Sequence, residues 1–155
     1  MIHIETSLEF PAGFEQLLPG LSEQAIRAAG AALRHEGAEG DLTILLAEDA
    51  RLRELNRDYL GVDAPTDVLA FPAAETDPDT GAAYLGDLLI SIPRAQAQAQ
   101  AADHPLGAEL QLLVVHGVLH LLGHDHAEPA DKARMWAAQA DVLKGLGLDG
   151  IAINE

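Results

Sequence analysis

The feature that constrains this chain most is a run of histidines in a strongly apolar segment, HGVLHLLGHDH at positions 116–126. Leucine and valine dominate from Leu110 onward, so the segment is predicted to form a helix that is apolar on nearly all sides and therefore buried. His116 and His120 lie four residues apart and share one face of that helix. A buried polar group without a partner costs about 1–3 kcal/mol, so the fold has to supply partners for both imidazoles.

Gly123 is predicted to end this helix, because glycine adopts the left-handed conformation without steric cost. The turn then brings His126 back toward His116 and His120. Three imidazoles with one open position are typical of a catalytic zinc site rather than a structural one. We therefore predict that these three histidines bind one Zn²⁺ per chain, although other divalent transition metals also suit such a ligand set.

The same spacing, His-x-x-x-His-x-x-Gly-x-x-His, occurs in the metzincin peptidases. In those enzymes a glutamate follows the first histidine and activates water, whereas this chain has Gly117 at that position. A glycine inside a helix costs about 1 kcal/mol relative to alanine, so Gly117 is predicted to make room for a close backbone approach or for a ligand. A peptidase reaction would lack its base here.

Two further residues of the run are candidates for the site. We expect His124 to be exposed or to face a substrate, because adjacent positions cannot all point inward; the alternative is a fourth metal ligand. Asp125 is a candidate for the carboxylate that hydrogen-bonds and orients a metal-bound imidazole. Its alternative interpretation is an ordinary turn residue.

The remaining sequence predicts strands and helices that alternate along one domain of residues 1–155. Ser22 and Asp49 are predicted N-caps, Pro72 is expected to end the third strand, and an exposed loop should follow at 73–81. Strands are predicted at 1–6, 41–47, 67–71 and 84–92, and helices at 22–36, 49–60, from Pro93, at 106–122 and at 129–146. This order predicts an α+β (mixed α/β) fold with a small, mostly parallel four-stranded sheet and about five or six helices.

Charge and composition exclude several classes of protein. The chain has 9 basic and 25 acidic residues, a formal net charge of −16, which argues against a broad basic surface for double-stranded nucleic acid. Cysteine is absent, which excludes a disulfide framework, a thiolate metal site and a cysteine nucleophile. The N-terminal residues lack the pattern of a signal peptide, so we expect a cytoplasmic protein that makes no membrane contact.

Three ordered segments resemble the YbeY endoribonucleases, the metal-dependent rRNA maturation factors of bacteria. They are LNRDYLGVDAPTDVLAFP at 55–72, LGDLLIS at 85–91 and the histidine run at 116–126. The resemblance implies a single-strand-specific, zinc-dependent endoribonuclease in 16S rRNA 3′-end maturation and ribosome quality control. It implies His116, His120 and His126 as the zinc ligands, and the ribosome or small-subunit assembly factors as partners.

The chain departs from this family at a position that bears on catalysis. The family commonly has an arginine after the aromatic residue of LNRDY, where this chain has Leu60, and the next basic position of the motif is Ala64. A guanidinium near the metal would stabilise the charge that develops on a phosphodiester during cleavage. Arg57, three residues before Leu60 on the same helix, is therefore our candidate catalytic residue, and an exposed surface charge is the alternative.

The predicted reaction is hydrolysis of a phosphodiester by a metal-bound water, whose pKa zinc lowers toward about 7. Four arginines are predicted to hold the backbone of single-stranded RNA: Arg51, Arg53, Arg57 and Arg94. Two alternatives stay open. One is a ribosome-associated metal-binding module with weak or no catalysis, which Leu60 and Ala64 favour. The other is a metal hydrolase of other substrates, such as a peptidase.

Overall fold

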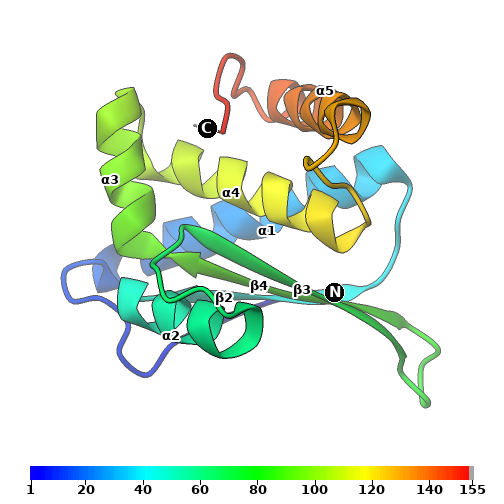
Figure 1. The fold of residues 1–155 in the computed structure, drawn as a ribbon, viewed down its shortest axis with the longest axis horizontal. Helices are drawn as coiled ribbons and strands as arrows, with labels where there is room; N and C mark the ends of the chain where they lie inside the picture. The colour runs from blue at the N-terminus through cyan, green and yellow to red at the C-terminus, as the bar shows by residue number, and fades with distance from the viewer. Residues whose placement is uncertain (154–155) are drawn as a thin grey trace.

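A computed structural model describes residues 1–153 as a four-stranded sheet with helices on both faces (Figure 1). The strands are β1 (Ile2–Thr6), β2 (Asp41–Ala47), β3 (Val68–Thr76) and β4 (Ala83–Ser91). The helices are α1 (Leu18–Glu36), preceded by the short 3-10 helix η1 (Glu15–Leu17), α2 (Asp49–Leu60), α3 (Ile92–Ala102), α4 (Leu106–Leu121) and α5 (Pro129–Gly145). Within these residues, no helix combines the length and apolar character needed to cross a bilayer.

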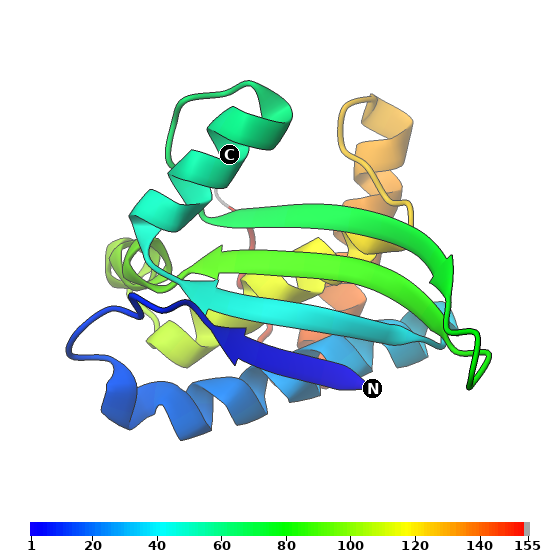
Figure 2. The same cartoon turned by 90° about the horizontal axis from the view of Figure 1, so that it is seen from below.

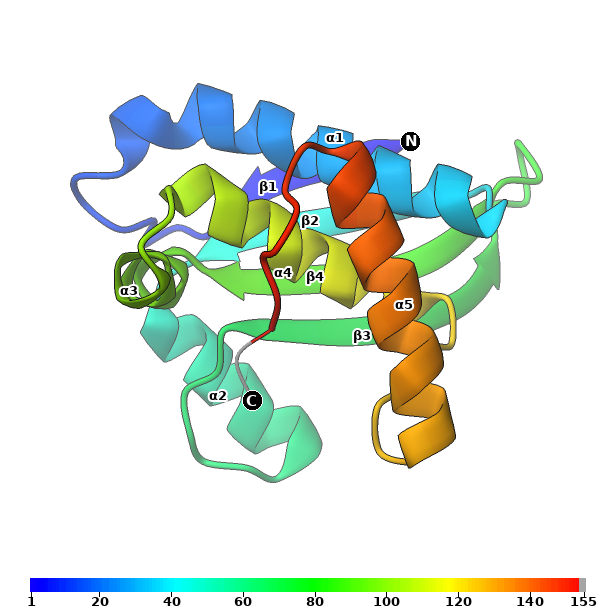
Figure 3. The same ribbon diagram turned by 90° about the horizontal axis from the view of Figure 1, so that it is seen from above.

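The sheet has the strand order β1-β2-β4-β3. β1 pairs with β2 and β2 with β4 in parallel, whereas β3 and β4 form an antiparallel hairpin. The predicted α+β fold with a mostly parallel four-stranded sheet is confirmed. In Figure 3, α1, α4 and α5 lie over one face of this sheet, and Figure 2 shows the opposite face, which α2 covers only along one side.

The core lies between the sheet and α4. Side chains alternate along β2, so that Leu42, Ile44 and Leu46 are fully buried toward the helical layer. Burying a leucine or isoleucine side chain contributes about 1.5–3 kcal/mol relative to leaving it exposed. Beside α4 on the same face of the sheet lies α1 (Figure 3), which packs a stripe of fully buried alanines against it: Ala25, Ala28, Ala29 and Ala32. α4 is therefore buried almost completely, as its composition predicts.

Two helix starts were predicted wrongly. α1 begins at Leu18 rather than after Ser22, because Pro19 occupies the first turn, where its fixed φ and missing N–H suit a helix start. Asp49 is the first residue of α2, and the N-cap position belongs to Glu48. The carboxylate of Asp49 is engaged elsewhere, since it accepts hydrogen bonds from Arg94.

The third strand was also predicted too short. β3 does not end at Pro72 but continues to Thr76, so the expected loop at 73–81 is partly strand. β3 is an edge strand, and its pairing with β4 shifts register between Pro72 and Glu75. An edge position with an irregular register tolerates a residue that lacks a backbone N–H, which explains why proline does not break this strand.

Gly86 of β4 provides a test of this hairpin. Its φ is +137°, and a Cβ there would lie 2.2 Å from the backbone oxygen of Phe71 on β3. We expect Gly86→Ala to lower the free energy of unfolding by about 3 kcal/mol, measured by urea denaturation. Gly81, in the hairpin turn, also has a positive φ but open space around its missing Cβ, so Gly81→Ala should cost only about 1 kcal/mol. Equal losses in the two variants would contradict the close contact between β3 and β4.

Candidate metal centre

The turn after α4 brings His126 beside the two helical histidines, as the sequence predicted. One nitrogen each from His116, His120 and His126 lies within 4.8 Å of the others. The ring centroids are 4.7 Å apart for His116 and His120, 5.5 Å for His116 and His126, and 5.2 Å for His120 and His126. Gly123 takes a φ of +99°, which allows the chain to reverse at this point.

The environment of the two helical histidines keeps them neutral. His116 is 7% exposed, and burial is the main cause that lowers its pKa from 6.5 to about 4. Burial likewise lowers the pKa of His120. A transition metal binds the lone pair of a neutral imidazole, so protons compete only weakly for these two side chains at neutral pH. The donors present therefore fit a divalent transition metal.

The orientation of His116 is set by Gln139, a residue that the sequence analysis did not identify. The Nδ1 atom of His116 lies 3.0 Å from Oε1 of Gln139, which is buried on α5. The amide oxygen can only accept, so Nδ1 donates and the lone pair of Nε2 remains available to a metal. The sequence does contain one indication that Gln139 is buried. It is a polar residue on the same helix face as the apolar Met135, Ala138 and Val142.

For Asp125 the structure shows the contact expected of its alternative interpretation, a turn residue. Its Oδ1 accepts a hydrogen bond from the backbone N–H of His126 at 2.7 Å, which is the behaviour of a turn residue. Trp136 of α5 instead contacts the cluster. Its ring stands at a steep angle to His116 and His126, with centroid distances of 5.9 Å and 5.4 Å.

His124 lies away from the other three histidines. Its Nε2 pairs with Oε1 of Glu36 at the end of α1, and both side chains are 21% exposed. His124 is thus partly exposed and paired with Glu36, and it lies outside the group of three histidines, so the alternative of a fourth metal ligand is not supported. Burial acts to raise the pKa of Glu36, but hydrogen bonds from His124 and His35 outweigh it, so the pKa is lowered.

At Gly117, which was predicted to make room for a close backbone approach or for a ligand, the structure shows a close side-chain neighbour. A Cβ at this position would lie 2.7 Å from Cδ2 of Leu88, a fully buried side chain of β4. The missing side chain thus allows α4 to pack onto the sheet. Gly117 also lines the cavity beside the histidines, so this position offers backbone where metzincins carry their catalytic glutamate, and a larger side chain here would have to displace the end of Leu88.

A cavity of about 440 Å³ adjoins the three histidines. Its opposite wall is formed by β3, by the segment before it and by Leu60 at the end of α2. Asp67 is a lining residue that the sequence analysis did not single out. Its two carboxylate oxygens accept hydrogen bonds from the N–H of Val68 at 2.8 Å and from Nε2 of Gln98 at 3.2 Å. The sequence indicated a site role for Asp67 only through its position, at the start of a strand after a proline-containing loop.

Leu60, and not Arg57, reaches this cavity. Leu60 is 57% exposed at the cavity wall. Arg57 is absent from the lining, and its Nε lies 3.0 Å from Oδ1 of Asp58 in solvent. Although the two residues lie one turn apart on α2, the structure does not bring the predicted catalytic arginine to the histidines.

The other three arginines expected to hold RNA are likewise paired with carboxylates. Arg94 donates from Nε and Nη2 to the two oxygens of Asp49, at 2.9 Å and 3.0 Å. The remaining pairs are Arg51 with Glu54 at 3.1 Å and Arg53 with Asp63 at 2.8 Å. These pairs leave little uncompensated positive charge on α2 for a phosphate backbone.

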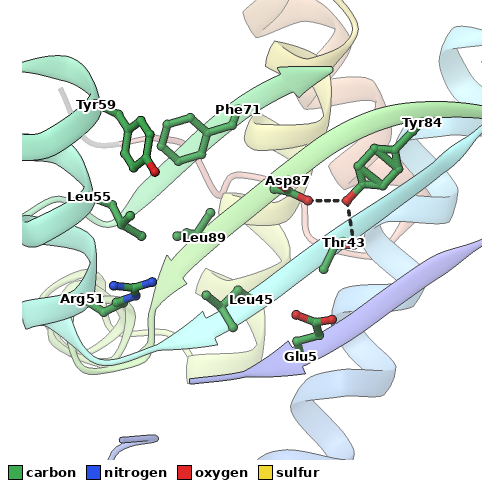
Figure 4. A pocket seen from close by; sticks show the side chains of 10 residues that line it. All are labelled: Glu5, Thr43, Leu45, Arg51, Leu55, Tyr59, Phe71, Tyr84, Asp87 and Leu89. Carbon is green, nitrogen blue, oxygen red and sulfur yellow. Dashed lines mark hydrogen bonds between the residues drawn. The ribbon is translucent and has the colours of Figure 1, made fainter. Parts of the chain in front are cut away.

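A larger cavity of about 540 Å³ lies on the other face of the sheet, between the strands and α2 (Figure 4). Its polar wall is a short network in which the Tyr84 hydroxyl bonds Asp87 and lies 2.8 Å from Oγ1 of Thr43. Burial raises the pKa of Tyr84. The lining has two carboxylates, Glu5 and Asp87, but no histidine. The smaller cavity therefore holds the metal-binding donors.

Comparison with known proteins finds one family among the matches. The family model described as Endoribonuclease YbeY matches residues 12–147. An Endoribonuclease YbeY of Moorella thermoacetica is 44% identical over 147 residues, 90% of this chain and 92% of that relative. A second, from Desulfitobacterium hafniense, is 46% identical over 137 residues, 84% of this chain and 87% of the relative.

A similar fold is known from a solution structure. TM1509 from Thermotoga maritima matches with a TM-score of 0.54 and 24% sequence identity, over 95% of this chain and 92% of that protein. At this identity the similarity concerns the fold alone.

The buried state of His116 predicts a pH dependence of stability in the metal-free protein. Unfolded His116 takes up a proton near pH 6.5, whereas the folded protein does so only near pH 4, so acid favours the unfolded state in this interval. We expect His116 alone to remove about 3 kcal/mol of stability between pH 7 and pH 4. Urea denaturation with a chelator present, compared with His116→Gln, measures this loss. Parallel stability curves for the two proteins would contradict it.

Proposed function

The chain belongs to the YbeY endoribonuclease family, and from this membership we propose that it is a metal-dependent endoribonuclease that cleaves single-stranded RNA. Its metal would be held by His116, His120 and His126, with one Zn²⁺ per chain. Three imidazoles with nitrogens within 4.8 Å of one another, at the wall of a cavity, support this role most directly.

A divalent metal at this site supplies Lewis acidity toward a phosphoryl oxygen and lowers the pKa of water. The residues of the chain provide the setting for that chemistry. Gln139 fixes the ring of His116, burial keeps His116 and His120 neutral, and Trp136 covers one side of the cluster. The open side faces the cavity.

The shape of the cavity supports a single-stranded substrate. A volume of about 440 Å³ is that of a small-molecule site, which suits one nucleotide rather than a duplex. Val68, Ala70 and Pro72 of the edge strand β3 form one wall. Because the nearby arginines are paired with carboxylates, contacts at the cavity rather than a basic surface would provide most of the binding.

We extend the proposal to 16S rRNA 3′-end maturation and ribosome quality control in the cytoplasm, with the ribosome or small-subunit assembly factors as partners and residues 1–155 as one domain. The family and its three sequence segments support this extension. A metal-binding module with weak or no catalysis is the second candidate, because the cavity presents Leu60 and Arg57 is paired with Asp58. A peptidase is disfavoured because Gly117 stands where metzincins carry the glutamate that activates water.

The metal-binding role is tested with His120→Ala. We expect the parent protein to contain about one zinc ion per chain and the variant almost none, because two imidazoles bind zinc much more weakly than three. Elemental analysis measures the content, and cleavage of an unstructured RNA should stop in the variant. His3→Ala, which removes an exposed imidazole on β1, is the control and should retain metal and activity. Full metal content in His120→Ala would refute the site.

The role of Leu60 is tested with Leu60→Arg. This substitution places a guanidinium at the cavity wall, where it can stabilise charge on the phosphodiester, so kcat/KM on single-stranded RNA should rise about tenfold or more. Val62→Arg adds the same charge at an exposed position outside the lining and is the matched control.

Arg57→Ala separates the two interpretations of that arginine. Since its guanidinium lies outside the cavity, we expect only a few-fold loss of kcat/KM, which should disappear at higher salt. A loss of about 100-fold would instead support the catalytic role predicted from the sequence. For the Leu60 prediction, equal kcat/KM values on single-stranded RNA in Leu60→Arg and Val62→Arg would show that position 60 does not limit catalysis.

A further inference from the structure

The fold does not hold the three histidines of the candidate metal centre equally firmly. His116 and His120 project from a buried helix, and His116 is fixed by Gln139. His126 is exposed and belongs to the segment 122–128 between α4 and α5. A ligand on such a segment has to be ordered when the metal binds, at about 1–2 kcal/mol of backbone entropy per residue, unless the fold orders it beforehand.

A residue far away in the sequence contacts this segment. His124, two residues before His126, pairs with Oε1 of Glu36, which is 88 residues away in the sequence. Glu36 is the last residue of α1, a helix anchored to α4 by its buried alanine stripe. Two residues span at most about 7 Å, so an anchored His124 confines the positions available to His126.

The Glu36 carboxylate has further contacts. The second carboxylate oxygen of Glu36 lies 2.9 Å from Nδ1 of His35, and Nε2 of His35 lies 3.6 Å from Oδ2 of Asp141 on α5. Both oxygens of Glu36 are thus engaged. The chain of contacts His124–Glu36–His35–Asp141 joins the segment 122–128, the end of α1 and the helix that carries Gln139.

We propose that Glu36 is a positioning residue for the metal centre: through His124 it pre-orders the segment that presents His126. This inference depends on the metal-binding role proposed above for His126. Glu36 lies outside the histidine group and the cavity lining, so it acts through His124 and not on the metal or the substrate. The benefit is a ligand set that is already assembled in the metal-free protein.

The test is the affinity for zinc ion, measured in competition with a chromophoric chelator. We expect Glu36→Ala and His124→Ala each to weaken zinc binding about tenfold, the size typical of residues that support metal ligands. The double variant should be no weaker than either single variant, because both changes remove the same contact. Glu36→Gln keeps an oxygen that can accept from His124 and should restore most of the affinity.

A second readout does not involve metal. In the metal-free protein, amide hydrogen exchange at residues 124–128 should be faster in Glu36→Ala than in the parent, with the core of α4 unchanged. Glu39→Ala removes an exposed carboxylate three residues away and controls for charge; both readouts should match the parent.

Parent-like zinc affinity in both Glu36→Ala and His124→Ala would overturn the positioning role. The metal site would still stand, because His120→Ala tests it separately. Additive losses in the double variant would also overturn the role, since they would show that the two side chains act independently. Should Glu36→Ala fail to fold, His124→Ala decides the question with the same two readouts.

Discussion

The structure depends on the burial of α4, a helix that is apolar on all sides and yet carries two imidazoles. Its leucines and valines pack against the sheet and against α1, so His116 is buried and His120 is partly buried, and both reach solvent only through the cavity. Burial disfavours the charged imidazolium and lowers the pKa of both side chains. The same burial that stabilises the fold therefore keeps two metal-ligand candidates in the form that a metal requires.

The surrounding helices support this arrangement from two sides. α5 supplies Gln139, which fixes the ring of His116, and the end of α1 supplies Glu36, which contacts the segment that carries His126. Gly117 allows α4 to lie against Leu88 of the sheet. The cavity beside the cluster is closed by β3, an edge strand whose outer side remains unpaired. The helices α1 and α5 and the sheet thus all contribute residues around the candidate site.

The sequence predicted those features that depend on residues close together in the chain. His116, His120 and His126 fall within one helical turn and one reversal, so spacing alone brings them together. β2 runs over Asp41–Ala47 as expected, because its alternating burial follows directly from its alternating residues. Gln139 and Glu36 escaped prediction because they lie 23 and 88 residues from their histidine partners, and no local pattern links them. Arg57 does not line the cavity, although it lies on the same helix as Leu60, because helical spacing does not determine which way a long exposed side chain extends.

His116, His120 and His126 together are proposed to bind one metal ion. X-ray absorption spectroscopy of the zinc-loaded protein tests this proposal most directly, because multiple scattering from imidazole rings gives the number of histidines bound to the metal. We expect three imidazoles per zinc in the parent protein and two or fewer in His126→Ala. A spectrum with fewer than three imidazoles in the parent, or one that His126→Ala leaves unchanged, would contradict it.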